Sequence, residues 1–93
     1  MDELRRNAQE WDRIIIHARE LIHEHTGRDL PIAVTEFNSA YDKSFGGETT
    51  PDSHFNAIWM ADVLGRLIRN GVFMANQWYL TAKPGYGGLG LIA

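Results

Sequence analysis

The stretch PIAVTEFNS, residues 31–39, decides the fold. Pro31 cannot continue a helix, and the apolar and β-branched residues after it are typical of a buried strand, which we expect over residues 32–37. Alternation predicts two faces, with Ile32, Val34 and Glu36 on one and Ala33, Thr35 and Phe37 on the other. Because both faces are apolar until Glu36, the pattern indicates a parallel strand with a carboxylate at its carboxyl end.

A helix precedes this strand in the sequence. Apolar residues that are separated by three and four positions predict it over residues 3–26. They are Leu4, Ala8, Trp11, Ile15, Ala18 and Ile22. Gly27 follows this run, and it can adopt the left-handed backbone conformation in which many helices end. We therefore expect Gly27 to terminate the helix.

A second helix and a second strand follow. Residues 38–53 form a long loop, a kind of segment that is often functional. Asp52 or Ser53 can cap a helix over residues 54–70, and an apolar strand is expected over residues 72–79. The predicted core face of this helix contains Ala57, Met60, Ala61, Leu64, Leu67 and Ile68. The order helix, strand, helix, strand predicts an α/β fold whose two strands pair in parallel through a crossover helix.

Composition limits the possible functions. The chain has 93 residues, enough for one small domain, and its formal net charge of −3 argues against a nucleic-acid partner. Charged residues interrupt every apolar run, so we expect no membrane partner. There is no cysteine, and His23 and His25 diverge on a helix at their i, i+2 spacing. We therefore expect no metal and no other cofactor, and the sequence does not indicate a cellular compartment.

Polar and aromatic residues gather where both predicted strands end. Glu36 and Asn38 follow the first strand, and Asn76 and Trp78 close the second. Open α/β sheets and barrels bind their ligands at the carboxyl ends of parallel strands. Amide groups can bond sugar hydroxyls, a Trp ring can stack on a pyranose, and a carboxylate can attack an anomeric carbon. These residues predict a carbohydrate site, to which Tyr41 in the long loop is a further candidate.

Two segments carry a resemblance to a known group of enzymes. VTEFN and HFNAIWMADVLGRLIRNGVFMANQWYL resemble the seventh strand, seventh helix and eighth strand of retaining (β/α)8-barrel glycoside hydrolases of the clan A type. The run ADVLGRLIRNGVFMANQW is most similar to the endoglucanase and xyloglucanase family, and the pieces EFN and MAN also resemble α-L-arabinofuranosidases. The resemblance covers residues 31–80. It implies that Glu36 is the nucleophile and that Trp78 lies under the sugar at the cleavage point.

The same resemblance implies that the chain is one part of a larger enzyme. A complete barrel has eight strands and about 250 residues, so this chain is expected to be a C-terminal part of a TIM barrel. The second catalytic carboxyl of the family has no matching position here, since Asp42 and Glu48 lie off the family pattern. The isolated chain is therefore expected to be inactive, and its expected partners are the remaining barrel strands or further copies of itself.

Each feature also has a plainer interpretation. Glu36 can pair with Arg28 or Lys43, and Trp78 can be a core aromatic residue. Asn38 can begin a turn, Asn76 can be a structural amide, and Tyr41 can be an exposed loop residue. The chain as a whole can be a non-catalytic α/β module that binds sugar or protein. A third alternative is nucleotide binding by GYGGLG, residues 85–90, but only three residues follow this motif, too few for the helix it requires.

Overall fold

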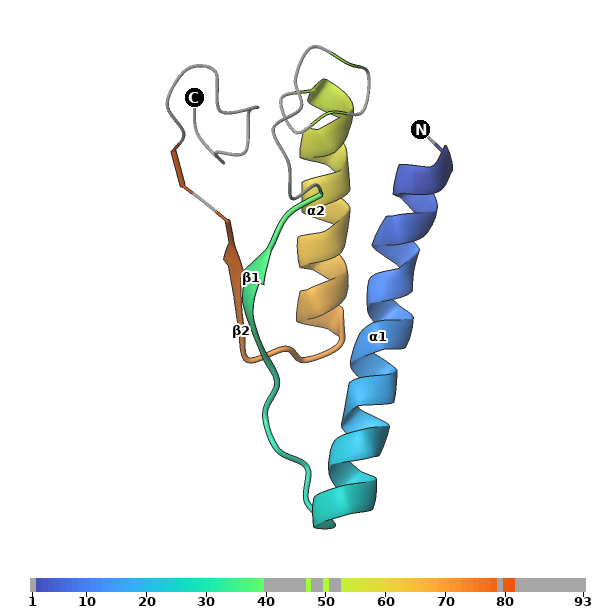
Figure 1. Cartoon of the computed structure of the whole chain (residues 1–93), viewed down its shortest axis with the longest axis vertical. Helices are drawn as coiled ribbons and strands as arrows, with labels where there is room; N and C mark the ends of the chain where they lie inside the picture. The colour runs from blue at the N-terminus through green and yellow to red at the C-terminus, as the bar shows by residue number, and fades with distance from the viewer. Residues whose placement is uncertain (1, 40–46, 48–49, 51–52, 79, 82–93) are drawn as a thin grey trace.

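The computed structural model describes residues 2–39, 47, 50, 53–78, 80 and 81 of the chain. It contains helix α1 (Asp2–Thr26), strand β1 (Ala33–Phe37), helix α2 (His54–Arg69) and strand β2 (Met74–Gln77). The two strands pair in parallel (Figure 1). The prediction of a small α/β unit with two helices and two parallel strands is confirmed, and β2 is shorter than the predicted strand over residues 72–79.

Glycines end both helices as the backbone geometry requires. Gly27 and Gly71 have φ angles of +66° and +67°, a region that costs most other residues free energy. After α2, the Gly71 N–H donates to the Ile68 carbonyl and the Val72 N–H donates to the Leu67 carbonyl, each at 3.0 Å. This pair of bonds is a Schellman motif, which satisfies the last carbonyls of α2 and turns the chain toward β2.

The hydrophobic core lies between the two helices and one face of the sheet. It contains Ala8, Ile15, Phe37, Trp59, Met60, Val63 and Leu67. The predicted face of α1 is confirmed, because Ala8 and Ile15 are buried. The predicted face of α2 is wrong in part: Ala57, Ala61, Leu64 and Ile68 are exposed. This helix is apolar on two sides, so periodicity could not tell which of them packs against α1 and the sheet.

The sheet contains an irregularity beside Glu36. Ala33 pairs with Met74 and Val34 with Ala75, but the next pair joins Phe37 to Gln77. Two residues of β1, Thr35 and Glu36, therefore lie opposite the single residue Asn76, as in a β-bulge. Phe37 consequently returns to the face of Val34 and is buried, with its ring edge-on to Trp11 at a centroid distance of 5.7 Å.

The bulge overturns the predicted faces of β1. Alternation placed Glu36 with Ile32 and Val34, but those two residues pack against the core and Glu36 is exposed. Phe37 was predicted on the other face and takes the core position instead. One additional residue in a strand exchanges the faces of all the residues that follow it, which a strict alternation of two cannot anticipate.

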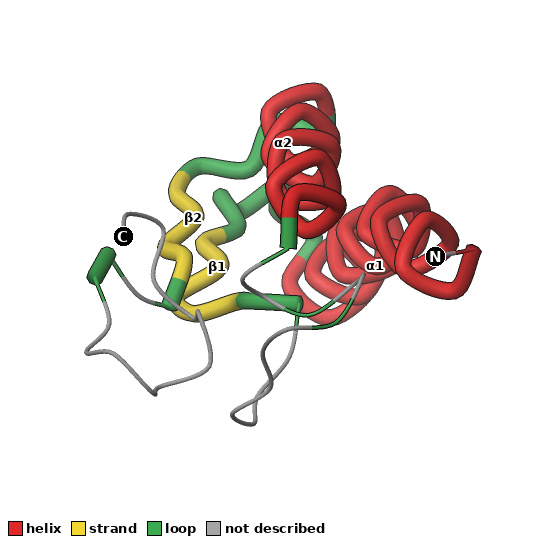
Figure 2. The backbone as a smooth tube through the Cα atoms, turned by 90° about the horizontal axis from the view of Figure 1, so that it is seen from above, coloured by secondary structure: helices red, strands yellow, loops and turns green. Residues whose placement is uncertain are grey.

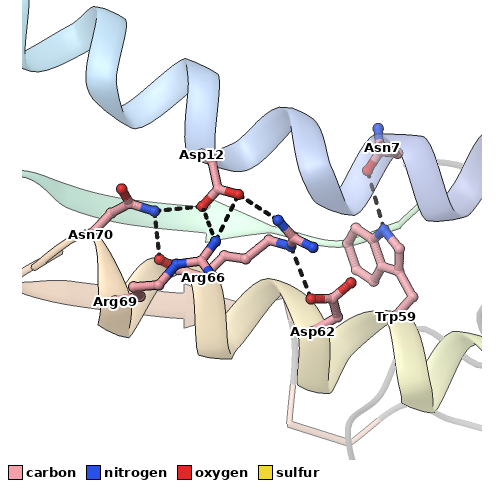
Figure 3. A network of polar contacts seen from close by, with 7 residues as sticks. All are labelled: Asn7, Asp12, Trp59, Asp62, Arg66, Arg69 and Asn70. Atoms are coloured by element: carbon pink, nitrogen blue, oxygen red, sulfur yellow. Dashed lines mark hydrogen bonds and ion pairs between the residues drawn. The ribbon is translucent and has the colours of Figure 1, made fainter.

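Polar contacts join α1 to α2 along the outer side of the core (Figure 3). Arg69 Nη2 donates to both Asp12 carboxylate oxygens at 2.9 Å, and Asn70 Nδ2 donates to Oδ1 at 2.7 Å. Arg66 also donates to Asp12, and it forms an ion pair with Asp62. The hydrogen bonds from Arg69, then Asn70 and Arg66, hold the pKa of Asp12 at about 2, although burial acts in the opposite direction.

Two further contacts fix the ends of this helix pair. Trp59 Nε1 donates to Asn7 Oδ1 at 3.2 Å, so the largest buried ring of α2 is bonded to α1. Arg19 Nη2 donates to the carbonyls of Asn70 and Gly71 at 2.6 and 2.9 Å. A cation at the carboxyl end of α2 is favoured by the helix dipole. The start of the turn into β2 is thereby held against α1.

Candidate functional site

The carboxyl ends of β1 and β2 lie side by side, and they carry the predicted site residues. The Trp78 N–H donates to the Phe37 carbonyl at 2.9 Å, so the pairing extends one residue past β2. Because the strands are parallel, Glu36, Asn38, Asn76 and Trp78 all belong to this one edge. The prediction that both strand ends meet is confirmed for the backbone.

Glu36 is exposed and makes no ion pair with any residue in the described part of the chain. The alternative in which Arg28 neutralises it is therefore not observed. Lys43, the other proposed partner, lies outside the described residues. A carboxylate at the end of a strand, turned out of the core by a bulge, remains accessible to a ligand.

Trp78 is 51% exposed and does not belong to the core. Asn76 and Met74 precede it on alternate positions of β2, and both are exposed, whereas Ala75 between them packs against the core. These three exposed side chains define the uncovered face of the sheet. The alternative that Trp78 is a core aromatic residue is wrong, and its ring has the partial exposure that stacking on a ligand requires.

Asn38 connects the two strand ends. Its Nδ2 donates to the Trp78 carbonyl, and its Oδ1 accepts a hydrogen bond from the Ser39 N–H at 2.7 Å. The second bond is the local turn interaction that Asn favours. The first is a long-range contact, in which the chain after β1 holds the chain after β2. Asn38 therefore helps to fix the backbone position of Trp78. No local sequence pattern predicted this contact.

Asn76 and Gln77 lie on opposite sides of β2. Gln77 is half-buried, pairs with Phe37 and lies on the helix-facing side, while Asn76 opposes the bulge from the exposed side. Asn76 makes no side-chain hydrogen bond within the described ranges, so its amide is available on the face of Trp78. The sequence did not predict the bulge, because neither Thr35 nor Glu36 is a glycine, the residue type that marks one common class of bulge.

The remaining candidates are placed as follows. Tyr41, Asp42, Glu48 and the motif at residues 85–90 lie outside the described residues. Apart from Glu36, no carboxylate of the described chain belongs to the ends of β1 and β2. Among the described side chains, no three of His, Asp or Glu come together as a metal site would require. His23 instead faces Asp29, with 3.5 Å between Nδ1 and Oδ1.

Comparisons with protein-family models, with curated proteins and with solved structures found no match to this chain. Neither described helix combines the length and the apolar character that crossing a bilayer requires. What the site can do therefore depends on the chemistry of its own residues. It offers one accessible carboxylate, one partly exposed indole ring and one accessible amide along a single edge.

Proposed function

We propose that this chain is part of a retaining glycoside hydrolase with a (β/α)8 barrel, in which Glu36 is the nucleophile. The observation that supports this most is the β-bulge at Thr35 and Glu36, opposite Asn76. It turns a carboxylate out of the core at the carboxyl end of a parallel strand, where barrels hold their active sites.

The barrel proposal also accounts for the two unequal faces of the sheet. In a (β/α)8 barrel the helices form an outer ring, and the inner face of each strand points into the barrel. Here α1 and α2 cover one face, and Met74, Asn76 and Trp78 are exposed on the other. The uncovered face corresponds to the inside of such a barrel.

The reaction would be a double displacement. The Glu36 carboxylate attacks the anomeric carbon, the glycosidic C–O bond breaks, and a covalent glycosyl-enzyme forms. A second carboxyl group about 5–5.5 Å away protonates the leaving oxygen and then removes a proton from the water that releases the sugar. That second carboxyl must come from another strand, so the chain by itself would bind sugar weakly and not turn it over.

Covalent labelling of the parent enzyme tests this function. A fluoro-sugar with an activated leaving group should inactivate the enzyme, and peptide mass mapping should find the adduct on Glu36. Glu36→Gln keeps the shape of the side chain but removes the attacking charge, so turnover should fall by several orders of magnitude. An adduct on Asp42 or Glu48 would contradict the assignment and move the nucleophile to the segment between β1 and α2.

A non-catalytic sugar-binding module is the second candidate, favoured by the single carboxylate at the described strand ends. Titration of the 93-residue chain with xylo- and cello-oligosaccharides, followed by the indole N–H resonances, tests binding directly. In both candidates the Trp78 signal should shift while those of Trp11 and Trp59 stay unchanged, since they belong to the helix side. Glu36 labelling in the parent enzyme then separates catalysis from binding.

A further inference from the structure

Trp78 lies just beyond the end of its strand. β2 ends at Gln77, and the Trp78 side chain is 51% exposed and outside the core. Packing therefore does not hold this ring in the way that it holds the buried rings of Phe37 and Trp59. A ring on which a ligand stacks has to keep part of its surface open, so its position must be fixed largely through the backbone.

Both backbone polar groups of Trp78 are bonded to the end of β1 and the residue after it. The Trp78 N–H donates to the Phe37 carbonyl at 2.9 Å, and the Trp78 carbonyl accepts a hydrogen bond from Asn38 Nδ2. Figure 2 shows the two strands side by side, with both helices on one side of them. The first bond joins two backbones, so any residue at position 37 could form it. The second requires an amide side chain at position 38.

The Asn38 side chain is itself oriented by a local bond. Its Oδ1 accepts a hydrogen bond from the Ser39 N–H at 2.7 Å, an interaction that asparagine favours in turns. With the oxygen held against its own backbone, the amide nitrogen is directed across to β2. Asn38 is also half-buried, so water competes less for its bonds than it would at an exposed position.

The same segment connects Trp78 to Glu36. Glu36 and Asn38 flank Phe37, whose ring is buried and whose carbonyl accepts the Trp78 bond. Phe37 thus anchors the segment in the core, while the bulge exposes Glu36 before it and Asn38 reaches to Trp78 after it. A displacement of Trp78 would change the position of its ring relative to the Glu36 carboxylate. Small misplacements of this kind can be costly to a reaction.

We propose that Asn38 is a positioning residue, whose side chain fixes the Trp78 ring relative to Glu36 so that a stacked sugar meets the carboxylate in a defined orientation. This inference rests on the proposed function and adds a role that the double displacement does not include. Asn38 acts through the backbone of Trp78, in place of the direct sugar contact that the sequence suggested. A ring that is fixed before the sugar arrives lowers the entropy that binding must offset.

Two substitutions separate these two hydrogen bonds of Asn38. At neutral pH, Asn38→Asp keeps an oxygen for the Ser39 N–H but has no donor for the Trp78 carbonyl, and Asn38→Ala removes both bonds. In both variants the order parameters of the Trp78 backbone N–H and Nε1–H, from ¹⁵N relaxation of the free chain, should fall from about 0.85 to below about 0.6. The variants differ in charge, so a shared effect excludes charge as the cause. Trp11 and Trp59 should keep their values, since they belong to the helix side.

Titration of the same samples with xylo- and cello-oligosaccharides measures the consequence for binding. Loss of this one bond should raise the Kd of both variants roughly three- to tenfold, with the far-UV circular dichroism unchanged. Gln9→Glu is the control, because it adds one negative charge at an exposed position of α1, away from the strand ends. It should bind the oligosaccharides like the unaltered chain.

The possible results distinguish the inference from the function on which it rests. Unchanged Trp78 order parameters in Asn38→Asp would overturn the inference, even if Asn38→Ala changed them, because the turn at Ser39 would then be responsible. Lower order with unchanged sugar affinity would also overturn it. If no oligosaccharide shifts the Trp78 signal of the unaltered chain, sugar binding itself fails. The order parameters need no ligand, so they decide in either case whether Asn38 fixes Trp78.

Discussion

The two sides of the sheet differ in how completely their side chains are bonded and packed. On the helix-covered side, Val34 and Phe37 pack against a core in which Val63 is fully buried, and Asp12 holds both helices in a dense polar network. On the uncovered side, Glu36 and Trp78 are exposed around a bulge.

This difference separates the residues that stabilise the chain from those that are available for chemistry. Packing and hydrogen bonding gain free energy only where groups leave water together, which happens on the covered side. A side chain that must meet a ligand cannot also be committed to the fold. Substitutions on the helix-covered side should therefore cause large losses of stability, and substitutions on the uncovered side should cause small ones.

The largest expected effect is in the core of the covered side. Leu67 is 2% exposed, and Leu67→Ala should lower the free energy of unfolding by about 2–5 kcal/mol, through lost burial and the cavity left behind. Urea unfolding followed by circular dichroism measures this. Ile58→Ala on the exposed side of the same helix is the control and should change stability by less than about 0.5 kcal/mol. Equal losses at both positions would contradict the assignment of the α2 core face.

The turn from α2 to β2 should show the next largest effect. Gly71 has a φ of +67°, and an added Cβ would lie 3.3 Å from Arg19 Nη2, so Gly71→Ala should cost about 1–2 kcal/mol. Gly65 lies inside α2 with nothing within 4 Å of an added Cβ. Gly65→Ala should therefore stabilise the helix by about 0.5–1 kcal/mol. Melting temperatures of the two variants should move in opposite directions, and a shared direction would contradict the turn geometry.

Local signals explain why most of the fold was predictable from the sequence. Gly27 and Pro31 bound α1 and β1, and Ser53 caps α2 as expected, accepting a hydrogen bond from the Asn56 N–H at 3.0 Å. Each of these residues acts on backbone within a few positions of itself. They set the order of the elements, and a strand–helix–strand order in turn predicts parallel pairing through the crossover helix.

Features that depend on tertiary contacts were not predictable in the same way. The core face of α2 is set by where α1 packs, which is why Val63 and not Leu64 is buried. The bulge at Glu36 is set by the pairing with β2, and the bond from Asn38 to the Trp78 carbonyl joins residues that are distant in sequence. For the site, the sequence identified the strand ends and their residues but not the face that Glu36 occupies.

A pH-dependent effect is expected at the polar network between the helices. The folded state lowers the pKa of Asp12 from 3.8 to about 2, so the ionised carboxylate stabilises the fold above about pH 4, and this contribution is lost as the pH falls toward 2. Asp12→Asn should therefore lower the urea midpoint at neutral pH, and the difference from the unaltered chain should shrink between pH 4 and pH 2.

Glu20→Gln is the control for this pH series, since Glu20 is exposed on the same helix and makes no ion pair with another described residue. Its urea midpoint should follow that of the unaltered chain at every pH. A difference for Asp12→Asn that stayed constant from pH 7 to pH 2 would show that the Asp12 charge does not stabilise the helix pair.

The smallest effect on stability is expected on the uncovered side, at Glu36. The side chain is exposed and bonded to no described residue, so Glu36→Gln should change the free energy of unfolding by less than about 0.5 kcal/mol. Phe37→Ala, one residue further, removes a buried ring and should cost about 3–5 kcal/mol. Urea unfolding of both variants at one protein concentration compares the two sides of the strand directly.

If Glu36→Gln instead cost more than about 1 kcal/mol, Glu36 would be a structural ion-pair partner, with Lys43 the first candidate to substitute. A neutral result means that the fold does not require a carboxylate at this position, as expected if the charge serves a ligand.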